Sequence, residues 1–298
     1  MRRLTSRMEQ GNNSAVALLV ITSVLWGSSF VSIKIGLTFV DPYDFAFLRS
    51  IITASILLVV LVSRGSFRSS ALREPAVWGL GLVSGMGYLF QFLGLEYTTA
   101  AKTALLIDLN VIVVAILSWK IFGESFGLRK QLGVVLGAVG AALITTNGDL
   151  SGLAQGQLKG DLFAFVSGLI FALFIVIHKR LQMQRDRNVI EMSSVVMLAT
   201  TIFLFPAALL LGGLNMRNIS LEGWGWVAFT AIACTVIPYA LWISALKAVT
   251  ATIASVVGLL EIVAAMVLST VLLGEGYSTA TLLGAILVLL SILAVAES

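Results

Sequence analysis

Charged side chains are scarce in this sequence. Only 11% of its 298 residues are Asp, Glu, Lys or Arg, whereas a soluble domain carries about 25%. Hydrophobic residues make up 58% of the chain, and the mean hydropathy is +1.01. The ten-residue alternating strands of a membrane β-barrel are also missing. The composition therefore excludes a soluble domain and predicts an all-α integral membrane protein.

Residues that commonly bind metals or form disulfides are equally rare. The chain has one cysteine, Cys234, and one histidine, His178, so an internal disulfide and a His/Cys metal cluster are both excluded. The chain contains no Gly-x-x-x-x-Gly-Lys-Ser/Thr sequence that would bind ATP phosphates. The net charge of +4 follows from membrane topology and does not require nucleic acid. We therefore predict no metal, no cofactor, no catalytic residue and no nucleic-acid partner.

Long apolar runs dominate the chain. Stretches such as "LFAFVSGLIFALFIVI" contain no ionisable side chain, and with their flanks they reach the roughly 20 residues that cross a bilayer. Turn sequences such as "VDPYD", "GESFGLRK" and "GGLNMRNIS" separate these runs. The pattern predicts ten transmembrane helices, at residues 14–36, 43–63, 75–96, 99–121, 129–147, 158–178, 190–212, 222–246, 250–273 and 277–296.

The basic residues predict the orientation of these spans, because Lys and Arg are enriched in cytoplasmic segments. With the N-terminus inside, fourteen of the 19 Lys and Arg residues lie on the inner side. The remaining five, on the outer side, are Lys34, Arg49, Lys102, Lys159 and Arg217. We therefore expect a multi-pass protein of the cytoplasmic (inner) membrane with both termini in the cytoplasm.

The chain also repeats itself. The stretch "LEYTTAAKTALLIDLNVIVVAILSWKIFGE" (95–124) aligns with "LKAVTATIASVVGLLEIVAAMVLSTVLLGE" (246–275) at a constant shift, which pairs Tyr88 with Tyr239 upstream. Each repeat holds five spans, and because five is odd the second copy must cross the membrane in the opposite sense. Inverted repeats are a recurring plan of secondary transporters, in which two equivalent halves enclose a central site.

This repeat predicts the domain organisation. A cytoplasmic tail (1–13) precedes the first five-helix repeat (14–147). An external linker (148–157) then leads to the second five-helix repeat (158–296). The two inverted repeats are expected to surround a central cavity.

Several motifs in this order resemble the drug/metabolite transporter superfamily, EamA type. They are "LWGSSFVSIK", "GLEYTTAAKTALL" and "ALKAVTATIAS" followed by "LLGE", and the resemblance spans residues 14–296. It implies a carrier of amino acids or other small metabolites, most often an exporter or exchanger. The family commonly has proline in the middle of its fourth and ninth spans. This chain has Asn110, Val111 and Ile262 there, so the resemblance leaves the bend of both helices open.

Charged and polar residues within the spans are the first candidates for a site, because such residues usually face a cavity or a partner. Glu261 lies about 16 Å into the ninth span, and its repeat equivalent Asn110 lies at the same depth in the fourth. Glu261 could bind cargo or a proton, or it could join two helices by hydrogen bonds. Arg49 and Asp108 lie at comparable depths and could form a structural ion pair, bind a zwitterion or close an outer gate.

Aromatic and amide side chains complete the predicted substrate site. Trp26, within the stretch "SVLWGSSFVSIK", would supply an aromatic wall with an N–H donor. Tyr88 and Gln91 share a face of the third span, and Tyr239 and Trp242 share a face of the eighth. Packing alone would also explain these positions. Together with Asn110 and Glu261, these five residues form the predicted substrate-binding set.

We therefore expect a secondary transporter that exports or exchanges small metabolites, amino acids first, by alternating access. Its partners would be the lipid bilayer, a small-molecule substrate and, as candidate coupling ion, the proton. A passive facilitator, an importer of sugars, nucleotide-sugars or drugs, and a membrane interaction protein without transport activity remain alternatives. The substrate, the direction of transport and the oligomeric state stay open at this level.

Overall fold

The computed structural model describes residues 2–65, 71–122, 127–146, 158–184, 189–245, 257–258 and 260–296. Within these ranges the chain is helical and contains no β-strand. The predicted external linker (148–157) and the connection between the predicted eighth and ninth spans lie outside the described residues.

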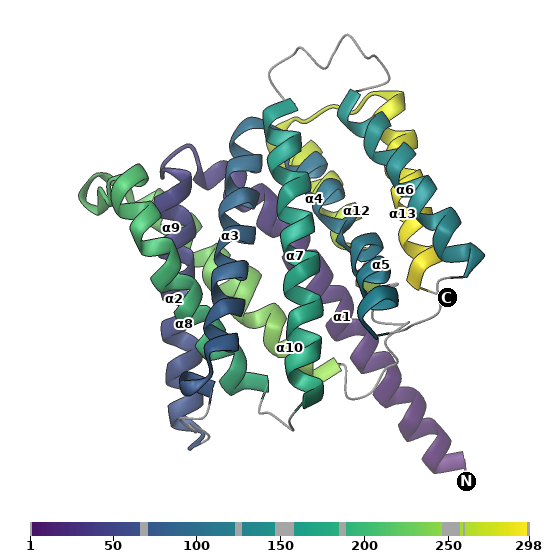
Figure 1. Ribbon diagram of the computed structural model, residues 1–298, viewed down its shortest axis with the longest axis horizontal. Coiled ribbons are helices and arrows are strands. Elements are labelled where there is room, and N and C mark those ends of the chain that lie inside the picture. Colours follow the sequence, from purple (N-terminus) through teal and green to yellow (C-terminus); the bar gives the residue numbers. More distant parts are fainter. Residues whose placement is uncertain are drawn as a thin grey trace.

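The first half of the chain forms five helical segments (Figure 1). They are α1 (Arg2–Gly36), α2 (Pro42–Ser63), α3 (Pro75–Tyr97), the pair α4 (Ala100–Asp108) and α5 (Asn110–Phe122), and α6 (Leu128–Thr146). A short 3₁₀ turn, η1 (Ala71–Arg73), precedes α3. These bounds agree with the predicted spans, except that α1 begins well before residue 14.

The second half repeats this plan. Its segments are α7 (Leu158–Gln184), α8 (Val189–Ala207) continued by the π-helical turn η3 (Ala208–Gly212), α9 (Leu221–Ala231) with the π-helical turn η5 (Ile232–Val236) and α10 (Ile237–Ala245), α12 (Leu260–Leu273) and α13 (Thr279–Ala296). A 3₁₀ turn, η4 (Met216–Asn218), precedes α9. Among the described residues, seven helices are long and apolar enough to cross a bilayer, and α12 and part of α13 are shorter apolar helices.

Local sequence explains where several helices begin. Asp41 caps α2 by accepting a hydrogen bond from the Tyr43 backbone N–H at 2.9 Å, and Pro42 occupies the first helical position. Thr99 caps α4 through the Lys102 N–H, and Ser220 caps α9 through the Gly223 N–H. Each cap satisfies a backbone donor that lacks a partner within its own helix.

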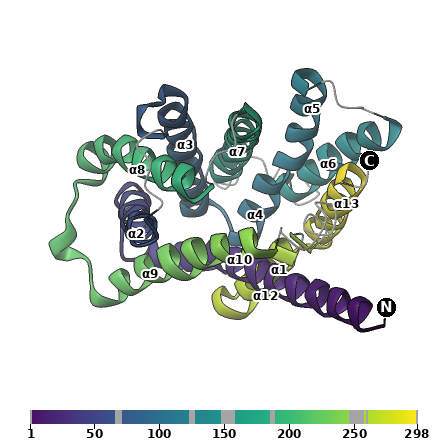
Figure 2. The same cartoon turned by 90° about the horizontal axis from the view of Figure 1, so that it is seen from below.

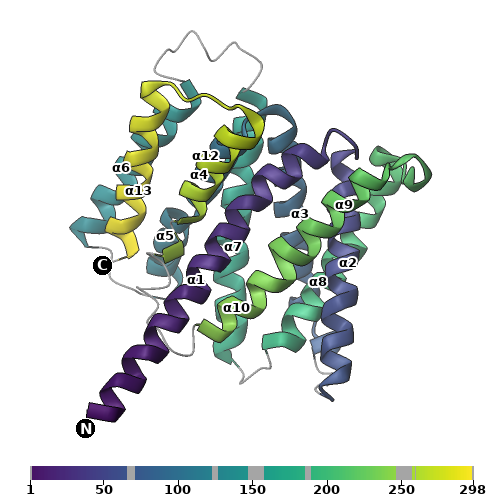
Figure 3. The same cartoon turned by 180° about the vertical axis from the view of Figure 1, so that it is seen from behind.

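The two halves pack with inverted symmetry. Helix α3 contacts α7 and α8, and in return α10 contacts α1 and α9 contacts α1 and α2. Helix α1 also contacts α12, as α4 contacts α7. In Figures 1 and 3, α1 ends near the top of the molecule, whereas α7 begins there and runs downwards. The protein is therefore an all-α membrane protein of ten spans in two inverted five-helix repeats.

Helices of opposite halves approach each other closely at glycines. A Cβ atom on Gly140 of α6 would lie 2.8 Å from the Gly284 carbonyl oxygen of α13, and one on Gly284 would lie 2.7 Å from the Gly140 carbonyl oxygen. In α3, a Cβ on Gly94 would lie 3.1 Å from the Ala164 nitrogen of α7. Small residues at these crossings allow the backbones to make the van der Waals contacts that hold helices together in lipid.

Candidate functional site

A cavity of about 390 Å³ lies between the two halves. Helices α1, α2, α3, α4 and α5 of the first half and α7, α8, η5, α10 and α12 of the second half contribute to its wall. Its volume falls within the range of about 300–1,000 Å³ that is typical of small-molecule sites. The view from below shows these helices arranged around a common centre, with α9 and α10 crossing in front of α1 (Figure 2).

Eight of the nine residues that we predicted from the sequence line this cavity. They are Trp26, Arg49, Tyr88, Gln91, Asp108, Asn110, Tyr239 and Glu261. Trp242, the ninth, is absent from the wall and packs behind it, with its ring 5.2 Å from the ring of Trp26. Trp242 can therefore orient Trp26 but does not line the cavity itself.

Gly27, beside Trp26, explains how α1 reaches the centre of the molecule. A Cβ atom at this position would collide with the backbone carbonyl oxygen of Glu261 and would lie 2.8 Å from the Cβ of Ala264. Only glycine lets α1 touch α12 here without displacing either backbone. This close contact brings the side chains of Trp26 and Glu261 into the same cavity.

A helix break places the polar residues of the fourth span. Leu109 separates α4 from α5, and the side chains on either side of it, Asp108 and Asn110, both line the cavity. Gly168 of α7 packs against the break, where a Cβ would lie 2.9 Å from the Ile107 carbonyl oxygen. The span is thus interrupted without the proline that is common in the family. Interrupted helices at a protein-lined cavity are typical of transporter binding sites.

Arg49 does not form the ion pair with Asp108 that we predicted as one possibility. Its Nε and Nη2 atoms instead donate to the Thr235 hydroxyl at 3.1 and 3.0 Å, and its guanidinium lies 4.8 Å from the Tyr88 ring centre. Within the described residues, the one ion pair between side chains joins Lys102 to Asp161. The π-helical turn η5 explains the difference, because it holds the Thr235 hydroxyl against α2, which position along the chain does not reveal.

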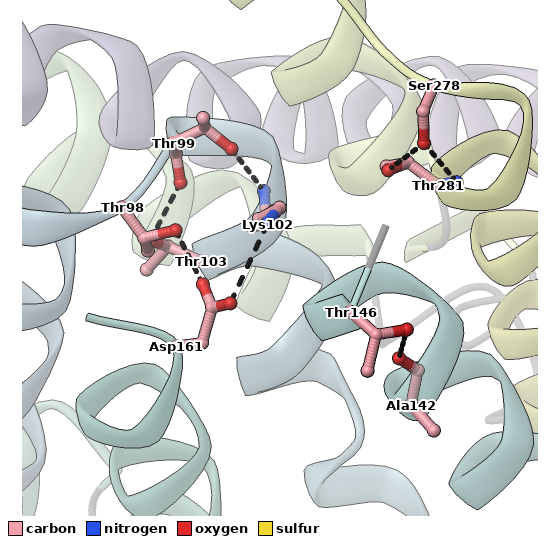
Figure 4. A network of polar contacts seen from close by, with 9 residues as sticks. All are labelled: Thr98, Thr99, Lys102, Thr103, Ala142, Thr146, Asp161, Ser278 and Thr281. Atoms are coloured by element: carbon pink, nitrogen blue, oxygen red, sulfur yellow. Dashed lines mark hydrogen bonds and ion pairs between the residues drawn. The ribbon is translucent and has the colours of Figure 1, made fainter. Parts of the chain in front are cut away.

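A polar network closes one end of the molecule. Asp161 at the start of α7 accepts a hydrogen bond from the Thr98 hydroxyl and lies 3.7 Å from the Lys102 ammonium (Figure 4). Lys34 at the end of α1 donates to the backbone carbonyl of Thr98 at 2.7 Å. Glu275, after α12, accepts from the Ala100 N–H at 2.9 Å. These five residues, Lys34, Thr98, Lys102, Asp161 and Glu275, are called the end clamp below.

The end clamp connects four segments from both halves, and it leaves no room for a side chain at Gly160. A Cβ there would lie 2.6 Å from the Thr98 nitrogen and 2.7 Å from the Tyr97 carbonyl carbon. Lys102 and Asp161 are both buried, so their ion pair is poorly screened by water. The helix ends at this side of the protein are therefore tightly joined.

The cavity extends towards the opposite end. His178, on its wall, lies about 26 Å along α7 from Asp161 of the clamp at 1.5 Å per residue. Ser193, at the start of α8, also lines the cavity and shares a hydrogen bond with the Tyr239 hydroxyl. His178 itself lies on the cavity wall with its ring 5.6 Å from that of Phe174.

Sequence reasoning missed several residues of the wall. Thr53 lies one helical turn after Arg49, and a search for polar neighbours at this spacing would have found it. Phe171 is the repeat equivalent of Trp26 when "LWGSSFVSIK" is aligned with "IFALFIVIHK", whereas Thr235 carries no comparable signal in the sequence. The Phe171 ring lies 5.4 Å from that of Tyr88 and fits against Gly87 of α3. Among the described residues, no group of three or more His, Cys, Asp or Glu side chains could hold a metal ion.

An inverted pair of five-helix bundles around a central cavity defines a multi-pass membrane transporter. Residues 13–146 and 158–296 each match the EamA-like transporter family, so the chain belongs to this family. An uncharacterized transporter of Archaeoglobus fulgidus is 31% identical over 241 residues, which cover 79% of this chain and 81% of that protein. The uncharacterized transporter YyaM of Bacillus subtilis is 27% identical, with 93% of this chain and 91% of that protein covered. A crystal structure with a TM-score of 0.67 and 19% identity shares the fold over 95% of this chain and 96% of that one.

Proposed function

We propose that the protein exports small amphipathic metabolites, with amino acids as the first class, by alternating access across the cytoplasmic membrane. The observation that supports this most is the difference between the two ends of the cavity. At one end the clamp joins the helix ends to one another. At the other end the cavity wall extends to His178 of α7 and Ser193 of α8. A rocking motion of the inverted halves would open the clamped end and close the other.

The distribution of basic residues supports a cytoplasmic opening. With the N-terminus inside, the clamp at the end of α1 lies on the outer side, and His178 and Ser193 lie towards the cytoplasm. A cavity open to the cytoplasm is the state that loads a substrate for export. The same orientation places both termini in the cytoplasm.

The cavity wall supports an amphipathic substrate. Trp26, Tyr88 and Phe171 provide aromatic surface, while Arg49, Asp108 and Glu261 provide charge of both signs. A predominantly apolar site with a few polar groups binds molecules that carry a hydrophobic part and a charged part. Amino acids and related zwitterions fulfil both conditions.

Glu261 is our candidate for proton coupling. It shares the cavity with Asp108, and two ionised carboxylates in one apolar site would repel each other strongly. Glu261 would therefore bind a proton in the outward-open state and release that proton in the inward-open state. This cycle would link cargo movement to the proton gradient. An exchanger of this kind would expel cargo while protons enter.

Counterflow in proteoliposomes tests this function. Purified protein would be reconstituted and loaded with single amino acids, and uptake of the labelled compound would be measured with and without a pH gradient. We expect saturable exchange that a protonophore slows when the gradient drives it. If the protonophore does not change the rate under a pH gradient, the protein is a passive facilitator. If only sugars or nucleotide-sugars show counterflow, the assignment of amino acids as cargo is overturned.

A matched cell assay tests the direction. Cells that express the protein should survive toxic amino acid analogues and dipeptides at higher concentrations than cells with an empty vector. Increased sensitivity to the same compounds would indicate import instead. A protein that moves none of these compounds in either assay would support a role without transport.

A further inference from the structure

Arg49 is a buried cation with no carboxylate in contact among the described residues. Its side chain is 7% exposed and lies within the membrane-spanning part of α2, yet among the described residues no carboxylate lies within 4.0 Å of its guanidinium. Burying one charge without a partner is strongly unfavourable, and buried guanidinium groups in proteins are normally paired. Within the described residues, no direct contact supplies the missing negative charge.

The surroundings of Arg49 hold it in place but do not neutralise it. Two of its nitrogens donate to the Thr235 hydroxyl, and the rings of Tyr88 and Phe92 lie 4.8 and 5.8 Å from its guanidinium carbon. The third nitrogen, Nη1, is buried and has no hydrogen-bond partner in the described structure. A planar guanidinium fixed on one edge and free on the other is suited to bind a carboxylate.

A second donor without a partner lies one helical turn away. The hydroxyl of Thr53 is buried and makes no hydrogen bond. Four other buried threonines of the described helices donate to the carbonyl oxygen four residues earlier, as Thr22 does to Leu18 at 2.8 Å and Thr201 to Met197 at 2.9 Å. Thr53 departs from this pattern, although a threonine hydroxyl in a helix can donate to a carbonyl oxygen of the preceding turn.

We propose that Arg49 and Thr53 form a binding site for the carboxylate group of the transported substrate. The site rests on the proposed function, because both residues line the central cavity. One carboxylate oxygen would accept from Arg49 and the other from the Thr53 hydroxyl. The wall residues Asp108 and Glu261 would then face the positively charged amino group of the same molecule.

The other occupants of this place fit less well. A phosphate dianion would neutralise Arg49, but it would also enter a cavity that already contains two acidic side chains. A side space of about 10 Å³ beside Arg49, Thr53 and Thr235 could hold at most one water molecule, whereas the cavity of about 390 Å³ that Arg49 and Thr53 also line has room for a substrate. A water could bridge the two donors but would leave the charge of Arg49 uncompensated. In a monocarboxylate with an amino group, the carboxylate would accept hydrogen bonds from Arg49 and Thr53, and the amino group would face the acidic side chains of Asp108 and Glu261.

Isothermal titration calorimetry on the full-length protein in lipid nanodiscs tests this site. The probes are L-leucine and L-phenylalanine, their amides, the corresponding decarboxylated amines and the corresponding acids without an amino group. We expect the amino acids to bind best and the acids without an amino group to bind more weakly. The amides and amines should bind at least tenfold more weakly than the amino acids.

Two substitutions assign the effect to the two residues. Arg49→Lys keeps the positive charge but removes the planar set of guanidinium N–H donors. It should weaken the binding of the amino acids at least tenfold and leave the affinity for the amides unchanged. Thr53→Val has nearly the same shape and removes a donor that has no partner in the empty protein. It should weaken amino acid binding about three- to tenfold without lowering the melting temperature.

Thr22→Val serves as the matched control, because it removes a buried hydroxyl that has a partner and lies outside the cavity wall. It should lower the melting temperature and leave binding unchanged. Equal binding of the amides and the amino acids would overturn the carboxylate site. So would unaltered amino acid affinity in both Arg49→Lys and Thr53→Val, or a wild-type protein that binds no carboxylate probe.

The calorimetric result is separable from transport. If carboxylates bind through Arg49 but no amino acid crosses the membrane in proteoliposomes, the carboxylate site stands and the proposed function fails. If amides and amines are exported as well as amino acids, transport stands and the carboxylate site is overturned.

Discussion

The two ends of the cavity differ in the kind of contact that shapes them. At the clamped end, charged side chains bind backbone groups and one another, as when Lys34 donates to the Thr98 carbonyl. At the other end, the wall consists of rings and hydroxyls such as those of Phe174, Ser193 and Tyr239. Hydrogen bonds and ion pairs between helix ends can break and re-form when the helices move. The rings at the other end form few such bonds, so helices can shift there without breaking them. The comparison indicates which end is closed by specific bonds.

The largest effect is expected from breaking the buried ion pair of the clamp. Lys102→Met leaves Asp161 buried without its cation, and removing one member of such a pair costs about 3–5 kcal/mol. We expect the clamped end to open. A cysteine at Ile107 on the cavity wall, with Cys234 replaced by alanine, should then react with a membrane-impermeant thiol reagent added outside.

The double variant Lys102→Met with Asp161→Asn is the control for this first experiment. It removes both charges and should restore much of the protection of the Ile107→Cys thiol. Protection that is equal in the wild-type background and in Lys102→Met would show that the ion pair does not hold this end closed.

A glycine tests the same end by shape alone. In Gly160→Ala the added Cβ would meet the Thr98 backbone, and such overpacking costs about 1–3 kcal/mol. Export should fall roughly tenfold, because 1.4 kcal/mol corresponds to a factor of ten. Gly79→Ala on α3 is the matched control, since a Cβ there has open space around it, and it should retain full activity. Equal export by the two variants would contradict tight packing at the clamp.

Glu261 tests the cavity between the two ends. If it carries the coupling proton, Glu261→Gln should still exchange amino acids but should no longer concentrate them when a pH gradient is applied. A gradient of one pH unit supplies about 1.4 kcal/mol, or a tenfold concentration ratio, to a one-proton exchanger. Glu222→Gln, an exposed residue of α9, should keep this ratio. Accumulation by Glu261→Gln at the wild-type level would exclude Glu261 as the coupling residue.

The smallest effect is expected behind the cavity wall. Trp242→Leu removes the ring that supports Trp26, and an aromatic pair contributes about 0.5–1.5 kcal/mol. The KM for amino acids should rise about two- to tenfold at an unchanged maximal rate, as measured by initial counterflow. Trp119→Leu, with a side chain 44% exposed on α5, should leave KM unchanged. An unchanged KM in Trp242→Leu would indicate that Trp26 needs no support.

Much of the fold and most of the candidate site could be predicted from the sequence. Apolar runs of membrane length and a repeat of five spans predicted the inverted bundles, and polar residues within spans led to eight residues of the cavity wall. The partners of Arg49 could not be predicted, because Thr235 reaches it through an irregular turn. The unsatisfied hydroxyl of Thr53 was equally hidden, since hydrogen bonding depends on atoms from distant parts of the chain.

The sequence by itself determined that the chain is a membrane protein, how many times it spans the bilayer and that its two halves have opposite orientations. These properties depend on composition, span length and the parity of a repeat, which are all local or countable. Only the tertiary structure decided that Lys102 pairs with Asp161 and that Arg49 contacts Thr235 and, among the described residues, no carboxylate. Both outcomes depend on side chains more than fifty residues apart meeting within a few ångströms, which packing of the two halves alone determines.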